Sequence, residues 1–153
     1  MFKNEYIFNN KLIKEYVYKF LCKRIFIMGY VLLIASLIMY TLTKNNTFLM
    51  LDIIVIFTII FSPSVMIKKI METSKKINNG KIEKTYIEFS DNIIMNEGKA
   101  HVEFEYTQIE KIVETKNLIL LATGTETAII VWKQGFTKGT QEEFLNFIKN
   151  KIK

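Results

Sequence analysis

Residue types that carry catalytic chemistry are scarce in this chain of 153 residues. The single cysteine, Cys22, excludes an intrachain disulfide and implies no particular compartment. The single histidine, His101, leaves too few His and Cys ligands for zinc, so we expect no metal site. His101 stands in an alternating segment with no Ser-His-Asp arrangement around it, and no glycine-rich phosphate loop is present. We therefore expect a protein that is not an enzyme and that has no cofactor and no small-molecule substrate.

Charge is missing from two long apolar runs. Ile25–Thr43 holds 19 residues without a charge, and Asn46–Ile67 has only Asp52. A helix of the first length rises roughly 28 Å, close to the roughly 30 Å hydrocarbon core of a bilayer. A helical hairpin buried in a soluble core is the alternative, but runs that are apolar on all sides need cover on all sides. The remaining residues cannot wrap them, so residues 25–67 are predicted to be a transmembrane hairpin in the lipid bilayer.

Positive charge is concentrated in the half with the apolar runs. Residues 1–84 hold 13 Lys/Arg and 5 Asp/Glu, a net of +8, and residues 85–153 hold 8 and 10, a net of −2. The basic residues flank the apolar runs and do not line a polar, aromatic surface, so we expect no nucleic-acid partner. Short cytoplasmic flanks collect Lys and Arg. Both termini are therefore predicted to be cytoplasmic, with "TKNNT" (residues 43–47) as the external turn between two spans.

Two residues inside the hairpin invite both a structural and a functional interpretation. Asp52 could lie near the interface at a helix N-terminus, where the helix dipole favours a carboxylate. It could also be an ion, proton or partner site, because acids inside a membrane are costly and often functional. Pro63 removes a backbone donor and predicts a kink near the cytoplasmic end of the second span, with a neighbouring serine satisfying the backbone.

The residues before and after the hairpin are more polar. Residues 1–24 are predicted to be an amphipathic arm, because apolar side chains recur at helical spacing over residues 10–23. Ahead of that helix, Glu5–Phe8 alternates and predicts a short strand. After the hairpin, residues 68–84 contain Asn-Asn-Gly and are interpreted as a helix end and a linker.

The periodicity changes from helical to alternating in residues 85–153. Six short segments separated by turn signals predict an antiparallel sandwich or barrel, and "KQGFTKG" (residues 133–139) is expected to end the strands. Thr140 and Glu143 then form a capping box that starts a final amphipathic helix. This order is that of a pleckstrin-homology-like fold, in which one helix closes a seven-stranded barrel. The N-terminal Glu5–Phe8 could supply the seventh strand.

The arm, the closely spaced apolar runs, "FEYTQIEKIVETKNLILL" and "FTKGTQEEFLNFIKNKIK" together resemble the YcxB-like family of small bacterial membrane proteins. The resemblance implies an α+β membrane protein in the bacterial cell membrane, with two transmembrane helices and a pleckstrin-homology-like domain. It implies architecture and little mechanism, because its motifs are patterns of apolar residues.

Two functions follow as expectations. The first is a non-enzymatic membrane-anchored protein whose cytoplasmic domain binds a protein partner or a second copy, with Trp132 and Phe136 as the aromatic contact candidates. Core packing is the favoured interpretation of Trp132. The alternative is a self-immunity protein against a membrane-active bacteriocin or toxin that acts through the hairpin, with Asp52 as the residue to examine.

Overall fold

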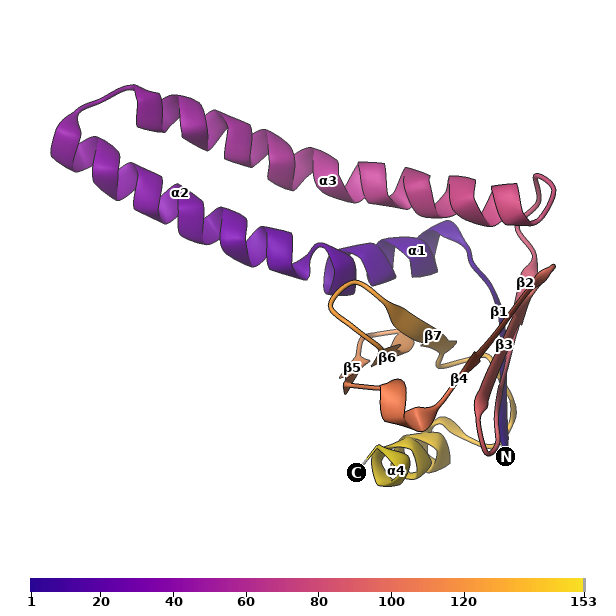
Figure 1. The fold of residues 1–153 in the computed structure, drawn as a ribbon. Coiled ribbons are helices and arrows are strands. Elements are labelled where there is room, and N and C mark those ends of the chain that lie inside the picture. Colours follow the sequence, from indigo (N-terminus) through magenta and orange to yellow (C-terminus); the bar gives the residue numbers. More distant parts are fainter. Residues whose placement is uncertain (153) are drawn as a thin grey trace.

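The computed structural model describes residues 1–152 and shows a long helical hairpin that projects from a β-rich domain (Figure 1). Within these residues there are four α-helices and two β-sheets, one of five strands and one of three. The α+β class expected from the sequence is therefore confirmed.

The hairpin consists of α2 (Lys23–Thr43) and α3 (Thr47–Ile77), which are both long and apolar enough to cross a membrane. The turn between them forms because Lys44 adopts the left-handed conformation, with φ of 54°, and ends α2. The side chain of Asn45 then accepts hydrogen bonds from the amide and the hydroxyl of Thr47, at 3.0 and 2.8 Å. "TKNNT" is thus a tight turn, as predicted.

The second helix is longer than its apolar run. α3 does not end at Ile67 but continues to Ile77, so the region interpreted as a helix end and linker is mostly helix. The extension is held because Met66, Ile70 and neighbouring apolar side chains pack against the N-terminal arm and the domain core. The connection from α3 to the domain is therefore short and fixed at both ends.

The N-terminal arm contains a strand and a helix, as expected, but the strand lies earlier than predicted. β1 spans Phe2–Ile7, and α1 spans Asn10–Tyr16 and continues as a π-helical turn at Val17–Leu21. The side chain of Asn9 caps α1 by accepting from the amides of Lys11 and Leu12, both at 3.0 Å.

The larger sheet includes β1 as an interior strand, between a strand from the start of the domain and one from its end. β1 pairs antiparallel with β2 over its whole length and with β8 near its start. In spatial order the sheet is β4-β3-β2-β1-β8, formed by Ala100–Phe104, Ile93–Glu97, Lys84–Phe89, Phe2–Ile7 and Phe136–Lys138. The N-terminal segment therefore completes the sheet of the C-terminal part.

The smaller sheet has the order β5-β6-β7 and is a meander of Lys111–Glu114, Leu118–Ala122 and Ala128–Trp132. All five residues of β6 are buried, as expected for a central strand covered on both faces. The final helix, α4 (Gln141–Lys151), begins at the predicted capping box of Thr140 and Glu143. Its Phe144 and Ile148 are fully buried in the core.

One expectation about the strands was wrong, and of the sandwich and the barrel the barrel is not observed in the part of the chain that the structure describes. "KQGFTKG" does not end the β region, because Phe136–Lys138 forms β8. The sheets also do not close into a barrel within residues 1–152. The three-residue β8 takes the place beside β1, and this leaves β7 joined to β1 by a side chain instead of a backbone ladder.

That side chain is Asn4, which is fully buried in β1. Its amide nitrogen donates to the carbonyl of Trp132 at 2.8 Å, and its amide oxygen accepts from the Trp132 backbone amide at 3.1 Å. Close by, the backbone carbonyl of Gly135 accepts a hydrogen bond from the backbone amide of Glu5 at 2.8 Å. A Cβ at Gly135 would lie 2.4 Å from the Glu5 oxygen, so only glycine permits this approach. Asn4 therefore connects the two sheets.

We predict that Asn4→Ala lowers the free energy of unfolding of the domain by about 3 kcal/mol, because it leaves a buried backbone donor and acceptor unpaired. Trp132, the single tryptophan, reports the transition by its fluorescence. Asn96→Ala is the control, because this exposed asparagine in β3 bonds only the exposed His101. Equal transition temperatures for the two variants would contradict the role given to Asn4.

Candidate functional site

The hairpin has a small polar interior. Gly29 and Ser36 of α2 are buried against α3, and a Cβ at Gly29 would lie 2.7 Å from a side-chain carbon of Ile59. The Ser36 hydroxyl donates to the carbonyl of Phe48 at 2.8 Å. The helices thus approach closely where small residues allow it, as in membrane helix pairs.

Asp52 lies in this interior and not on the outer surface of the hairpin. It is 7% exposed, and within residues 1–152 its Oδ1 atom is buried without a hydrogen-bond partner. It is placed more than one turn into α3, where the helix dipole contributes little. Asp52 is therefore a buried carboxylate with unused hydrogen-bonding capacity.

Pro63 is buried within α3, and the helix continues through it. The hydroxyl of the preceding Ser62 donates to the carbonyl of Thr58 at 2.6 Å. A serine beside the proline thus bonds the helix backbone, and α3 remains one element from Thr47 to Ile77.

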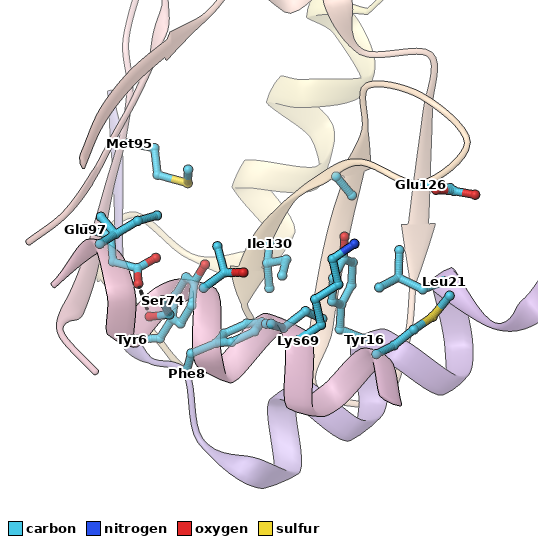
Figure 2. A pocket seen from close by; sticks show the side chains of 15 residues that line it. Tyr6, Phe8, Tyr16, Leu21, Lys69, Ser74, Met95, Glu97, Glu126 and Ile130 are labelled. Atoms are coloured by element: carbon cyan, nitrogen blue, oxygen red, sulfur yellow. Dashed lines mark hydrogen bonds between the residues drawn. The ribbon is translucent and has the colours of Figure 1, made fainter. Parts of the chain in front are cut away.

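A cavity of about 430 Å³ lies where the hairpin joins the domain. Its walls come from β1, α1 with its π-helical turn, the extension of α3, and strands β3 and β7. Figure 2 shows Tyr6, Tyr16 and Lys69 among the side chains around this space. We call it the junction cavity; it is lined by Tyr6, Phe8, Tyr16, Leu21, Met66, Lys69, Ile70, Thr73, Ser74, Ile77, Met95, Glu97, Glu126, Ala128 and Ile130.

One side of the junction cavity is fixed by apolar packing between the arm and α3. Ile13, Val17 and Cys22 form a buried cluster against Met66 and Ile70. The Cys22 thiol donates to the Met66 sulfur at 3.5 Å, and burial raises the pKa of this thiol. Cys22 is therefore a packing residue and a poor nucleophile.

The other side is fixed by hydrogen bonds between the end of α3 and the β3–β4 hairpin. Glu97 accepts from the Ser74 hydroxyl at 2.6 Å and from the Asn78 amide at 3.2 Å. Asn78 in turn accepts from the Lys99 backbone amide at 3.3 Å. Gly98 has φ of 55°, and a Cβ there would overlap the Asn78 side chain. The carboxylate of Glu97 is thus occupied in holding α3.

Tyr6 and Tyr16 bring hydroxyl groups to the apolar wall of the junction cavity. Burial raises the pKa of Tyr6 far above its ordinary value and raises the pKa of Tyr16 to about 12. Both side chains are therefore neutral at physiological pH and can donate a hydrogen bond. No local sequence pattern predicts this grouping, because Tyr6, Tyr16 and Lys69 come together around the cavity only after folding.

Trp132 and Phe136, the aromatic contact candidates, are both half-buried and pack on the core. The Phe136 ring lies 5.2 Å from the ring of Phe144 in α4. Both also line a separate depression of about 400 Å³ beside β1. The structure does not bring them near Asp52, which lies in the hairpin.

β4 is an open edge of the larger sheet. His101, Val102 and Glu103 are exposed in it, and among the strands of residues 1–152 it pairs only with β3. Glu97 faces Ala100 across a two-residue turn, and this closing pair is hydrogen-bonded through its backbone. From this pair onward, non-hydrogen-bonded and hydrogen-bonded pairs alternate along the two strands. The backbone groups of His101 and Glu103 consequently point away from β3, toward the free edge.

Within residues 1–152 no group of three or more His, Cys, Asp or Glu side chains could hold a metal ion. The His101 ring lies on the surface, with Nδ1 2.6 Å from the Asn96 side-chain oxygen.

Glu15 ties the arm to the smaller sheet. Its carboxylate accepts from the backbone amide of Asn117 at 2.7 Å and also from the Asn117 side chain. Burial alone raises the pKa of this carboxyl, but the hydrogen bonds from Asn117 outweigh it, and the pKa is lowered from its ordinary 4.5. The contact is therefore strongest with Glu15 ionised.

The lowered pKa of Glu15 predicts a pH-dependent contribution to stability. Because the folded pKa lies below the unfolded one, the stabilisation is full at neutral pH and is lost as pH falls from about 4.5 through the folded value. Glu15→Gln should lower the transition temperature at neutral pH and match the wild type in strong acid. Glu142→Gln, exposed on α4, is the control. If the difference in transition temperature between the wild type and Glu15→Gln stays constant as the pH falls, Glu15 is not the source of the pH dependence.

Comparison with known proteins identifies one family. Residues 89–148, from the end of β2 into α4, match the model of the YcxB-like protein family. No match was found among curated proteins or among solved structures. The resemblance seen in the sequence is thereby confirmed over residues 89–148, which are similar to the YcxB-like family.

Proposed function

We propose that the protein is anchored in the bacterial cell membrane by α2 and α3. Most of their large apolar side chains are exposed, among them Leu42 at 74% and Met50 at 68%. An exposed apolar surface of this extent is far larger than soluble proteins carry, and lipid would cover it. The basic residues near Lys23 and Lys68 favour placing both termini and the domain in the cytoplasm.

The domain, in this proposal, is a non-enzymatic module of pleckstrin-homology-like descent that binds a protein partner. The succession of antiparallel strands followed by one core-packed helix supports the kinship. The observation that carries the binding function is the open edge of β4. Exposed edges present unpaired backbone groups that a partner strand can bond. β4 thus offers a strand-addition site in which His101 and Glu103 supply the backbone groups.

We predict that His101→Pro abolishes partner binding at β4. Proline removes the outward amide and leaves the β3–β4 bonds in place, since His101 does not bond β3 through its backbone. His101→Ala is the matched control, because it removes the same side chain and retains the amide. Cross-linking in membranes, followed by recovery of the cross-linked partner, measures the effect.

The proposal requires the same partner to be recovered with wild type and His101→Ala and lost with His101→Pro. A homodimer in wild type and His101→Ala that His101→Pro makes monomeric would identify the partner as a second copy. Equal recovery with all three chains would contradict strand addition.

A second function, self-protection against a membrane-active bacteriocin or toxin, is favoured by one observation. Asp52 is a buried carboxylate with an unpaired oxygen in the hairpin. A buried acid of this kind is costly unless something binds it. In this function the hairpin itself, and not the β4 edge, recognises the attacking molecule.

Asp52→Asn distinguishes the two functions, because it removes the charge and keeps the shape. If the hairpin recognises a toxin, the variant should lose protection in a killing assay, and His101→Pro should retain it. If β4 is the functional surface, Asp52→Asn should recover the same cross-linked partner as the wild type, and His101→Pro should lose it. Ser36→Ala is a control for loss of a polar group in the same helix contact. Replacing residues 27–64 with an unrelated hairpin also distinguishes the two functions. This exchange leaves the contacts of Phe26 and Met66 in place.

A further inference from the structure

The junction cavity has a neighbour along the hairpin. A groove of about 400 Å³ runs between α2 and α3 and under the loop that joins β6 to β7. The two spaces share Leu21, Met66 and Glu126 as lining residues. They are therefore adjacent chambers with a common wall, one against the domain and one along the hairpin.

Both chambers have mainly apolar walls. The groove reaches from Leu21 down to Leu32 of α2 and Val55 of α3, within the part of the hairpin placed in the bilayer. The junction cavity adds aromatic and aliphatic side chains from the domain, among them Phe8 and Ile130. A hydrocarbon chain could pass from the bilayer to the cavity along the groove without crossing water. Each volume is in the range of sites for small ligands.

Charged groups of both signs stand at the common wall. Lys69 lines the cavity and follows Met66 by three residues in α3, so the two side chains share a face of that helix. Arg24 lines the groove near the start of α2, shortly after Leu21 in the chain. Glu126 lines both chambers. Two cations and one free carboxylate match a headgroup that carries a phosphate and an amine.

We propose that the two chambers bind one membrane phospholipid with a phosphate-and-amine headgroup. One acyl chain occupies the junction cavity, and the other lies in the groove between α2 and α3. Arg24 and Lys69 hold the phosphate at the common wall, and Glu126 accepts from the amine. The inference rests on the membrane anchoring proposed above, and it is independent of the β4 edge.

The test uses the full chain in nanodiscs of phosphatidylethanolamine and phosphatidylglycerol in equal parts. Native mass spectrometry after release counts the retained lipids. The wild type should retain one phosphatidylethanolamine. Lys69→Gln should weaken retention about tenfold, as expected for one lost charge-assisted hydrogen bond. Lys68→Gln is the matched control, because Lys68 is the preceding exposed lysine and lines a different surface.

A second pair of variants tests the acyl-chain chamber. Thr73→Trp projects a large ring into the junction cavity from the exposed side of α3 and should abolish retention. Glu72→Trp places the same ring on the neighbouring, outward surface and should retain the lipid. Unchanged transition temperatures show that the variants fold, so a loss of lipid reports the site.

Three results would each overturn the lipid site. The two lysine variants could retain the lipid equally, or the two tryptophan variants could do so. The third result is that the wild type retains phosphatidylethanolamine and phosphatidylglycerol equally. Retention of inorganic phosphate with equal affinity in place of the lipid would also overturn it. Fractionation of the wild type separates this failure from failure of the anchor. If the wild type is found in the membrane but retains no specific lipid, the proposed anchor stands and the proposed lipid site fails. If the wild type is recovered without detergent, both proposals fail.

Discussion

The insertion of β1 into the larger sheet is the constraint on which the rest of the structure depends. β1 lies between β2 and β8, and Asn4 in its centre bonds the backbone of Trp132 in the smaller sheet. β1 precedes the hairpin in the sequence, whereas its partner strands β2 and β8 follow the hairpin. The hairpin must therefore leave and return to the same side of the domain. Both ends of the hairpin are consequently held by one folded core, and the domain cannot be complete without the residues before the hairpin.

This closure explains why the hairpin is attached firmly. The arm packs against α3 through the cluster around Cys22 and Met66, and the end of α3 is bonded to the β3–β4 hairpin through Glu97. Between these two attachments the side chains do not fill the space, and the junction cavity remains. The cavity between the hairpin and the domain thus results from attaching α3 to the domain at two separate places, around Met66 and around Glu97.

The candidate residues found in the sequence belong to separate places. Asp52 is in the hairpin interior, and Trp132 and Phe136 are on the domain beside β1. His101, which only the structure brings forward, lies on the free edge of β4. The structure therefore does not assemble one active centre from them. It offers distinct surfaces that can be tested one at a time, and Pro63 retains a structural position within α3.

The sequence by itself determined the elements whose signal is local. The apolar runs specify α2 and the first part of α3, the polar residues 43–47 specify the turn between them, and the capping box at Thr140 starts α4. The sequence also indicated a resemblance to the YcxB-like family, through the pattern of apolar residues in residues 104–121 and 136–153. Only the tertiary structure decided the continuation of α3 past Ile67, the three-residue β8 and the open sheets. Each of these depends on contacts between segments far apart in the chain, and no local periodicity records them. The junction cavity belongs to the same class, because its walls come from five elements that meet only after β1 has entered the sheet.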